Sequence, residues 1–289
     1  MKFTVQTETL SQLREALASE CEGIRFGMEF CEWKIPSLET LKKAYEEVEV
    51  TGKDFAYVIP ILSNVGVEKT REHLAYISEC EDVEVIIGDI GVFNLLRDYD
   101  GLRIRLGRPR VYIPSRSPWD QITRIPNPSF LARRKVEKIF YQTNLNYGRA
   151  LEYYRGLGVE GADVDWIPKS FPHYKKIVRN GFRLAVHTYA VPVALTMRCH
   201  TARFLGEAEP ALCTKPCLTK AFDIEQKELN KSFVLLGNVV FRLVESTRNE
   251  NRELQRTGVE EMVLPMGPVS RLSTTEDVDA AIATLSRGA

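Results

Sequence analysis

Three cysteines late in the chain are the residues that point most directly to chemistry. Cys199, Cys213 and Cys217 lie in the run MRCHTARFLGEAEPALCTKPC, with thirteen residues between the first two and three between the last two. Because thiolates are preferred ligands of zinc and of iron–sulfur clusters, this grouping indicates a metal centre. Cys31, in the run RFGMEFCEWK, is the best candidate for a fourth ligand.

The spacing of these cysteines bears on which metal they would hold. Structural zinc sites are usually assembled from close Cys-x-x-Cys pairs. Here one ligand is remote, one is at an intermediate distance and two form a C-x₃-C pair. Scattered ligands are common for iron–sulfur clusters, whose cubane takes one thiolate per iron. The pattern therefore favours an iron–sulfur cluster, with zinc and a metal-free protein as the alternatives.

The other cysteines and the chain's start indicate a reducing compartment. The N-terminal run MKFTVQTETLSQ has no apolar stretch after its lysine, so no secretory signal is visible. No apolar run reaches the length of about eighteen residues that a membrane span needs. We therefore expect a cytoplasmic protein with reduced thiols and no membrane span. Cys21 and Cys80 each end a helical pattern and are expected to pack against the core.

Short apolar runs alternate with helical patterns along most of the chain. Strands are expected at Phe3–Val5, Gly23–Met28, Phe55–Leu62, Val83–Ile87, Leu102–Leu106, Ala162–Trp166, Arg183–Tyr189, Phe233–Leu236 and Glu261–Leu264. Helices are expected at Leu10–Leu17, Leu38–Val48, His73–Tyr76, Val92–Leu96, Tyr147–Leu157, Phe171–Arg179, Asn249–Arg256 and Glu276–Leu285. Ser37 reads as the N-cap of the second of these helices.

This alternation predicts a parallel sheet built from β/α units. Eight or nine strands within 289 residues fit a single (β/α)₈ barrel domain over residues 1–289. An open doubly wound sheet is the second choice. Irregular loops near 107–128 and 197–223 interrupt the rhythm, and the second of them carries the cysteines. In a barrel both loops would follow strands and lie at the face where barrel active sites are found.

Charge and motif content exclude several classes of function. Lysine plus arginine and aspartate plus glutamate number 39 each, so no bulk basic field exists to hold DNA or long RNA. Neither GxGxxG nor GxxxxGK[ST] occurs, which leaves nucleotide binding without support. Neither GxSxG nor HExxH occurs, and a thiolate nucleophile would compete with metal ligation. Peptidase activity is therefore not expected.

Two further positions are candidates for a catalytic role. Arginines concentrate around one predicted strand end, at Arg103, Arg105, Arg108, Arg110 and Arg116. Because a guanidinium binds carboxylates in a bidentate manner, Arg108 is the preferred contact for a small anionic substrate. The alternative is a solvated loop paired with nearby acids. His187, in the predicted strand LAVHTYAV, is either catalytic or a core histidine. His73 and His173 are expected on exposed helix faces.

Several segments resemble the collagenase-like peptidase family, also known as unassigned-type peptidase family 32. The segment LAVHTYAVPVALTMRCHTARFLGEAEPALCTKPC is similar to its signature region, and MRCHTAR reproduces the Arg-Cys tag of short members from anaerobic ubiquinone biosynthesis. Upstream, IRFGMEFCEWK resembles the stretch with the remaining cysteine, and LGRPRVYIPSR resembles the Gly-Arg loop. Downstream, LLGNVV and TGVEEMVLPMGPVS resemble the last two strand regions. The likeness covers essentially the whole chain.

The resemblance implies a [4Fe–4S] cluster whose four ligands are Cys31, Cys199, Cys213 and Cys217. It further implies a role in oxygen-independent hydroxylation in ubiquinone biosynthesis, together with a homologous UbiU-like subunit. Prephenate is the small anionic substrate implied for related members. The alternatives are a cluster-bearing scaffold without catalysis, a zinc-stabilised binding protein, and a prephenate-dependent hydroxylase of another substrate.

Overall fold

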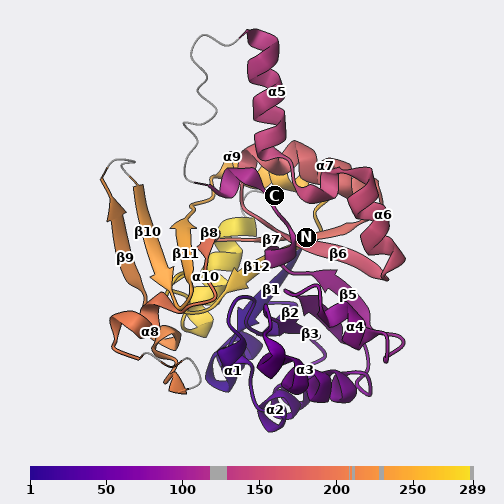
Figure 1. Ribbon diagram of the computed structural model, residues 1–289, viewed down its shortest axis with the longest axis vertical. Helices are drawn as coiled ribbons and strands as arrows, with labels where there is room; N and C mark the ends of the chain where they lie inside the picture. Colours follow the sequence, from indigo (N-terminus) through magenta and orange to yellow (C-terminus); the bar gives the residue numbers. More distant parts are fainter. Residues whose placement is uncertain (118–128, 208, 210–211, 228–230, 287–289) are drawn as a thin grey trace.

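A closed barrel of parallel strands forms the body of the protein (Figure 1). The computed structural model describes residues 1–117, 129–207, 209, 212–227 and 231–286. The strands follow the order β1-β12-β7-β6-β5-β4-β3-β2 around the barrel. They are β1 (Lys2–Thr7), β2 (Gly23–Gly27), β3 (Asp54–Ile59), β4 (Glu84–Ile87), β5 (Arg103–Leu106), β6 (Val159–Asp165), β7 (Arg183–His187) and β12 (Glu261–Pro265). The predicted (β/α)₈ barrel is confirmed.

Helices cover the outside of the barrel, as the alternating pattern predicted (Figure 1). They are α1 (Leu10–Ala18), α2 (Leu38–Glu49), α3 (Asn64–Ile77), α4 (Val92–Leu96), α6 (Gly148–Gly156), α7 (Phe171–Arg179), α9 (Arg248–Gln255) and α10 (Thr275–Ser286). A further helix, α5 (Phe130–Tyr141), stands away from the barrel at the top of the view.

Helix α2 illustrates how the sequence pattern sets this packing. The side chain of Ser37 accepts a hydrogen bond from the Thr40 N–H, so the predicted N-cap is confirmed. The residues at helical spacing are buried against the strands, as expected: Leu41, Ala44, Tyr45 and Val48. Their apolar faces join the main core between the helices and the outward side of the sheet.

The inside of the barrel has a different composition. Side chains alternate across each strand, so the residues between the outward apolar positions point into the lumen. Several of these are charged and almost fully buried: Arg25, Glu84, Arg105, Asp163 and Glu261. Barrel interiors are usually filled by branched apolar side chains, so this barrel replaces part of that packing by buried ion pairs.

A second, antiparallel sheet is inserted between β7 and β12 (Figure 1). Its strands pair in the order β8-β11-β10-β9, with β8 (Ala190–Leu195), β9 (Phe222–Gln226), β10 (Lys231–Leu236) and β11 (Val239–Leu243). We expected the strand at Phe233–Leu236 in the barrel, and this was wrong, because it lies within β10 of the inserted sheet. The short helix α8 (His200–Phe204) and the cysteine loop lie between β8 and β9.

The first irregular segment follows β5 as expected. It contains two 3₁₀ turns, at Arg108–Arg110 and Pro114–Arg116, and its remainder over 118–128 lies outside the described residues. Within the part of the chain that the structure describes, no helix combines the length and the apolar character needed to cross a membrane.

Candidate functional site

The four predicted thiol ligands lie where the carboxyl-terminal mouth of the barrel meets the inserted sheet. Cys31 follows β2 and precedes the 3₁₀ turn Glu32–Lys34, and Cys199 is the N-cap residue of α8. Cys217 is buried in an apolar cluster against which Cys31 also packs. The buried members of that cluster are Met28, Phe30, Ala190, Cys217, Leu236, Val239 and Phe241.

The thiols are close enough to affect one another electrostatically. Burial is the main cause that raises the pKa of the Cys31 thiol to about 11, and Cys217 and Cys199 add to the rise. Burial likewise raises the pKa of Cys217 and of Cys213, with Cys199 as a further contributor to both. Cys31 therefore packs against the cluster that holds Cys217 and lies within electrostatic range of Cys199, despite their separation in sequence.

Backbone donors point at two of the sulfur atoms. The Ala202 N–H donates to Cys199 Sγ with an N···S distance of 3.4 Å, and the Lys215 N–H donates to Cys213 Sγ at the same distance. Lys215 has φ of 59°, a left-handed conformation that is uncommon for a residue with a side chain. Hydrogen bonds of this kind stabilise anionic sulfur and tune metal centres built on thiolates.

A buried ammonium group lies beside the same thiols. Lys34 is only 6% exposed, and its Nζ lies 2.5 Å from Glu8 Oε2. It also interacts with Cys217, where its charge lowers the thiol pKa against the larger effect of burial. A cation held in this position would offset negative charge that develops on the sulfur atoms.

Asn238 ties together the segments that carry the cysteines. Its Nδ2 donates to the carbonyl oxygens of Phe30 at 2.8 Å and Thr196 at 3.0 Å. The neighbouring Gly237 has φ of +62°, and a side chain there would lie 3.6 Å from Cys217 Sγ. Sequence reasoning missed Asn238, although a Gly-Asn pair between apolar runs is a hairpin-turn signal.

A small cavity of about 50 Å³ adjoins Cys217. It lies between the mouth of the barrel and the inserted sheet, because both contribute to its lining. Apolar side chains form much of that lining, including Met28, Phe30, Leu236, Phe241 and Met266. Polar residues of the barrel mouth, Glu29 and Arg108 among them, line it as well. The structure thus brings Arg108 and Cys217 to one cavity.

Arg108 is already engaged by carboxylates. Its Nη2 lies 2.5 Å from Glu29 Oε2 and its Nη1 lies 3.4 Å from Asp165 Oδ1. Burial alone lowers the pKa of Arg108, but Glu29 outweighs this effect and keeps that pKa raised. Of the alternative, a solvated loop paired with nearby acids, the pairing is confirmed for Arg108 and Arg105, whereas solvent exposure is wrong because they are 4% and 3% exposed. A role for Arg108 as a substrate contact stays a prediction.

His187 lies beneath the cavity and is fully buried. Its Nε2 is 2.9 Å from Asp163 Oδ2 and 3.9 Å from Glu29 Oε1. Burial lowers the pKa of His187 well below its ordinary value, and the charge of Arg108 adds to this. This favours the neutral imidazole. His187 is near Glu29, which lines the cavity, and its catalytic role also stays a prediction.

Glu29, Asp163 and His187 have the spacing of a metal site, with ligand atoms within 4.8 Å of one another. Two cations already occupy their surroundings. Arg25 Nη1 lies 2.6 Å from Asp163 Oδ2, and Arg108 pairs with Glu29. A divalent cation would therefore add charge beside two guanidinium groups. The arrangement is better explained as one end of the ion-pair network of the lumen.

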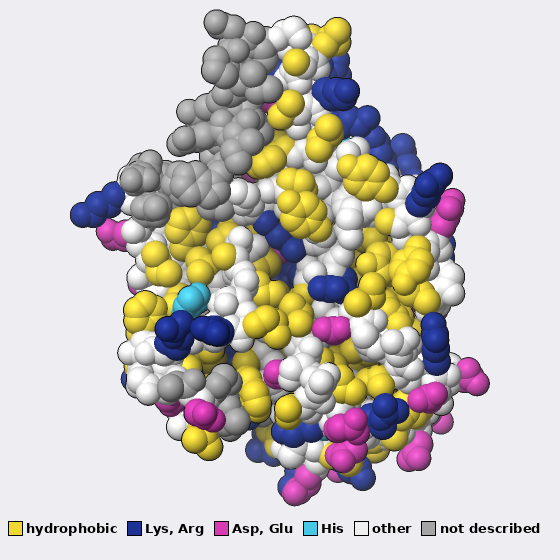
Figure 2. Space-filling model, viewed as in Figure 1, with side chains coloured by type: hydrophobic (Ala, Val, Ile, Leu, Met, Phe, Trp, Pro, Cys, Tyr) yellow, Lys and Arg dark blue, Asp and Glu magenta, His cyan; other side chains and the backbone are white. Residues whose placement is uncertain are grey.

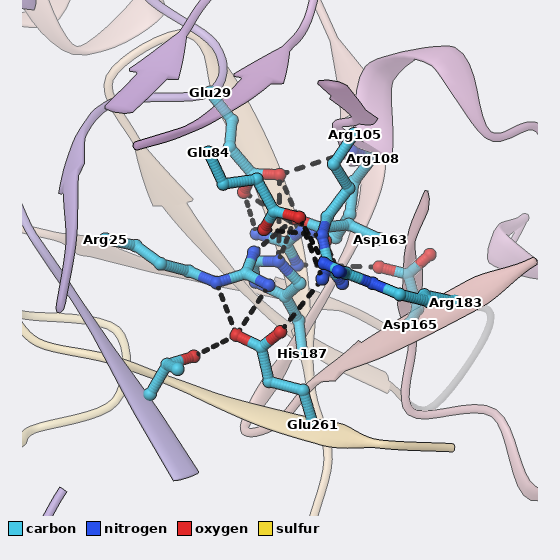
Figure 3. Close-up of polar contacts among 11 residues, drawn as sticks. Arg25, Glu29, Glu84, Arg105, Arg108, Asp163, Asp165, Arg183, His187 and Glu261 are labelled. Atoms are coloured by element: carbon cyan, nitrogen blue, oxygen red, sulfur yellow. Dashed lines mark hydrogen bonds and ion pairs between the residues drawn. The ribbon is translucent and has the colours of Figure 1, made fainter. Parts of the chain in front are cut away.

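Figure 3 shows how that network continues along the barrel axis. Arg25 Nε lies 2.9 Å from Glu261 Oε1, and Arg105 bridges Glu84 at 2.9 Å and Glu261 at 3.2 Å. Although burial alone raises the pKa of Glu261, Arg25 and Arg105 hold it far below its ordinary value. The carboxylates and guanidinium groups are thus mutually neutralised inside the barrel, together with Asp163.

Two histidines expected on exposed helix faces are buried. His73 is 1% exposed, and its Nδ1 lies 2.6 Å from the Tyr57 hydroxyl. His173 is 8% exposed. The prediction was wrong because α3 and α7 turn these residues toward the barrel, where the imidazole serves as a core side chain.

The burial of His73 makes stability depend on pH. Burial lowers its pKa to about 4, and the charge of Lys69 adds to this. The unfolded chain, with a histidine pKa of about 6.5, binds the proton first, so the free energy of unfolding falls as pH drops below that value. We expect His73 to contribute a slope of about 1.4 kcal/mol per pH unit between pH 6.5 and pH 4.

Urea unfolding at several pH values measures this slope. His73→Gln should lower the slope of unfolding free energy against pH by about 1.4 kcal/mol per pH unit. The slope that remains comes from His187 and the buried carboxylates. His200→Gln is the matched control, because His200 is exposed. An unchanged slope in His73→Gln would contradict the assignment.

Comparison with known proteins adds only distant likenesses. No protein-family model matches the chain, and no curated protein matches its sequence significantly. Among solved structures, thiamine phosphate pyrophosphorylase from Pyrococcus furiosus is similar with a TM-score of 0.47 and 10% identity, covering 99% of this chain and 95% of that one. The U32 peptidase Mk0906 is similar with a TM-score of 0.47 and 13% identity, covering 93% of each chain.

Orotidine 5'-phosphate decarboxylase from Lactobacillus acidophilus is similar with a TM-score of 0.43 and 10% identity, covering 99% of this chain and 98% of that one. Likenesses this distant carry no argument about activity. The barrel assignment rests on the chain's own strand pairing.

Proposed function

We propose that this chain binds one [4Fe–4S] cluster through Cys31, Cys199, Cys213 and Cys217. The observation that carries the proposal is that Cys31 packs against the apolar cluster of Cys217 at the barrel mouth, with Cys199 within electrostatic range of both. The N–H donors to two sulfur atoms and the ammonium of Lys34 support it, because they suit anionic sulfur.

The spread of the thiols favours a cluster over a single zinc ion. Four thiolates around one zinc, with Zn–S bonds of about 2.3 Å, lie about 3.8 Å from one another. Within the described residues, the set of ligand atoms that meets within 4.8 Å is Glu29, Asp163 and His187, which contains no thiol. A cubane with one thiolate per iron accepts ligands that lie further apart.

When bound, such a cluster supplies one-electron transfer at a potential set by its surroundings. The residues of this chain would hold it, shield it from water with the apolar cluster around Cys217, and offset its charge with Lys34. The sequence has no dinucleotide-binding fingerprint, so electrons would have to arrive from another protein.

We further infer a role in oxygen-independent hydroxylation in ubiquinone biosynthesis, as a UbiV-like protein. The cysteine spacing and the MRCHTAR tag support this reading. The small cavity beside Cys217 adjoins the proposed cluster ligands and would have to widen to admit an anion such as prephenate. Arg108 in its lining is the candidate contact for that anion. Competition from Glu29 for that guanidinium means that such an anion would have to displace an existing ion pair.

Anaerobic purification followed by iron, sulfide and zinc analysis tests the metal assignment. Complementation of anaerobic ubiquinone synthesis in a strain lacking the UbiV-type protein tests the pathway. About four irons and four sulfides per chain with restored synthesis would support both parts. Cluster binding without complementation would leave the metal assignment standing and reject the pathway.

The same proposal predicts a stable complex with a homologous UbiU-like subunit. A formal charge of zero leaves no net self-repulsion to oppose association. Co-expression of the two chains followed by anaerobic size-exclusion chromatography should give co-elution at the mass of a heterodimer. A cluster-loaded chain that restores synthesis and elutes alone would contradict the partnership and leave the fold and the metal assignment intact.

A further inference from the structure

Helix α5 is the element that the barrel and the candidate site leave unexplained. It projects from the body of the molecule (Figure 1), and none of its residues is buried. Its C-terminal end is the anchored one, since the Lys169 ammonium lies 5.2 Å from the centre of the Tyr141 ring. The chain enters the helix at the far end, so Phe130 and Leu131 form its tip.

The tip is apolar and largely exposed, although the Arg134 guanidinium lies 5.6 Å from the centre of the Phe130 ring. Phe130 is 71% exposed and Leu131 is 76% exposed, whereas Val136 and Phe140 further down the helix are half-buried. An exposed aromatic and an exposed leucine side by side are unfavourable in water, because each keeps its apolar surface hydrated. Ile139 near the anchored end is 48% exposed, so the two most exposed large apolar side chains of α5 are the pair at its far end.

Basic residues follow this apolar tip along the helix. The next residues along the helix are cationic, and a fourth cation follows one turn later: Arg133, Arg134, Lys135 and Lys138. The single acid of the helix, Glu137, pairs with Arg133 at 3.4 Å. Figure 2 shows basic side chains along one side of this projection and apolar ones beside them. In a chain with no net charge, this excess is local.

An anionic lipid surface fits this arrangement best. Helices that bind membrane surfaces carry aromatic and leucine side chains that enter the acyl boundary and lysine or arginine side chains that remain at the headgroups. A protein groove that holds a helix reads apolar anchors at i, i+3, i+4 and i+7 along one face. Phe130 and Leu131 are adjacent and point about 100° apart, which suits insertion of the helix end rather than of a side.

We propose that the tip of α5 inserts into an anionic lipid surface. Phe130 and Leu131 enter the boundary of the acyl chains, and Arg133, Arg134 and Lys135 lie at the level of the headgroup phosphates. The barrel and its cavity are then held beside the membrane without any segment crossing it. This inference is independent of the cluster and of the proposed hydroxylation.

Co-sedimentation of the full chain with vesicles tests it. Binding to vesicles of phosphatidylcholine with phosphatidylserine should exceed binding to phosphatidylcholine alone and should weaken as salt is raised. Phe130→Ser with Leu131→Ser should lower partitioning at least about tenfold. Arg134→Gln with Lys135→Gln should lower it about 25-fold at low salt, at about fivefold for each cation near the surface.

Matched double variants on the barrel control for composition. Val50→Ser with Val65→Ser removes two exposed apolar side chains, and Lys42→Gln with Lys43→Gln removes two exposed cations. Both should bind vesicles like the unmodified chain. Circular dichroism and thermal unfolding check that each variant is folded. We expect the tip variants to fold because the replaced side chains are exposed.

A depth measurement separates insertion from loose electrostatic contact. Leu131→Trp should show fluorescence that brominated lipid quenches. The proposal is overturned if the unmodified chain fails to bind anionic vesicles, if the barrel variants lose binding as the tip variants do, or if Leu131→Trp is not quenched. If vesicle binding is absent and the tip variants instead dissociate a protein complex, the tip is a protein-binding surface.

Discussion

Replacing Cys31 with serine is expected to lower the iron content of the anaerobically prepared protein from about four atoms per chain to less than one. A cubane takes one thiolate per iron, so the loss of one ligand leaves a corner unprotected and the cluster labile. The effect should appear in iron and sulfide analysis and as loss of blue-region absorbance. Cys31 gives the sharpest test because only the fold brings it to Cys217 and Cys199.

Cys80→Ser is the matched control for this experiment. Cys80 is a partly buried free thiol that donates to the Tyr76 carbonyl oxygen at 3.4 Å, a bond that a serine hydroxyl can also form. The Cys80→Ser variant should therefore retain full iron. Full iron in Cys31→Ser would remove Cys31 from the ligand set, and stoichiometric zinc in the unmodified protein would move the site to the structural-zinc alternative.

The barrel could be predicted because its signals are local. Most barrel strands hold a short apolar stretch and are followed by a helical pattern, and the N-cap and buried face of α2 follow from residues within one helix. The inserted sheet could not be predicted in the same way. Its hairpin strands β10 and β11 are short and lie where the alternating rhythm predicts another β/α unit.

The lumen network was missed because its partners come together only through barrel closure. Arg25 lies on β2, Asp163 on β6 and Glu261 on β12, so no local pattern links them. The signal that was available is the placement of charges at alternate positions of otherwise apolar strands, as in Arg103-Ile-Arg105 and Asp163-Val-Asp165. Such a charge has no solvent to face in a closed barrel and therefore requires a partner.

The thiol ligands could be grouped from sequence because three of them are close along the chain. The residues that support these thiols could not be predicted in this way. Lys34 and Asn238 act from segments far from the cysteine loop, and neither carries a sequence signal for metal binding. Their positions follow from tertiary packing between the barrel mouth and the inserted sheet.

Replacing Arg25 with methionine is expected to lower the free energy of unfolding by about 3–5 kcal/mol, because Asp163 and Glu261 would remain buried without their shared guanidinium. In a chain of this size that corresponds to a fall of roughly 10 °C in Tm. Arg14→Met is the matched control and should leave the free energy of unfolding nearly unchanged, since Arg14 pairs with Glu47 on the surface, where solvent screens the charges. Adding Glu261→Gln to Arg25→Met should recover part of the loss, because it removes one of the two carboxylates that lost a guanidinium partner. Equal losses for Arg25→Met and Arg14→Met in urea unfolding would show that the lumen ion pairs do not hold the barrel together.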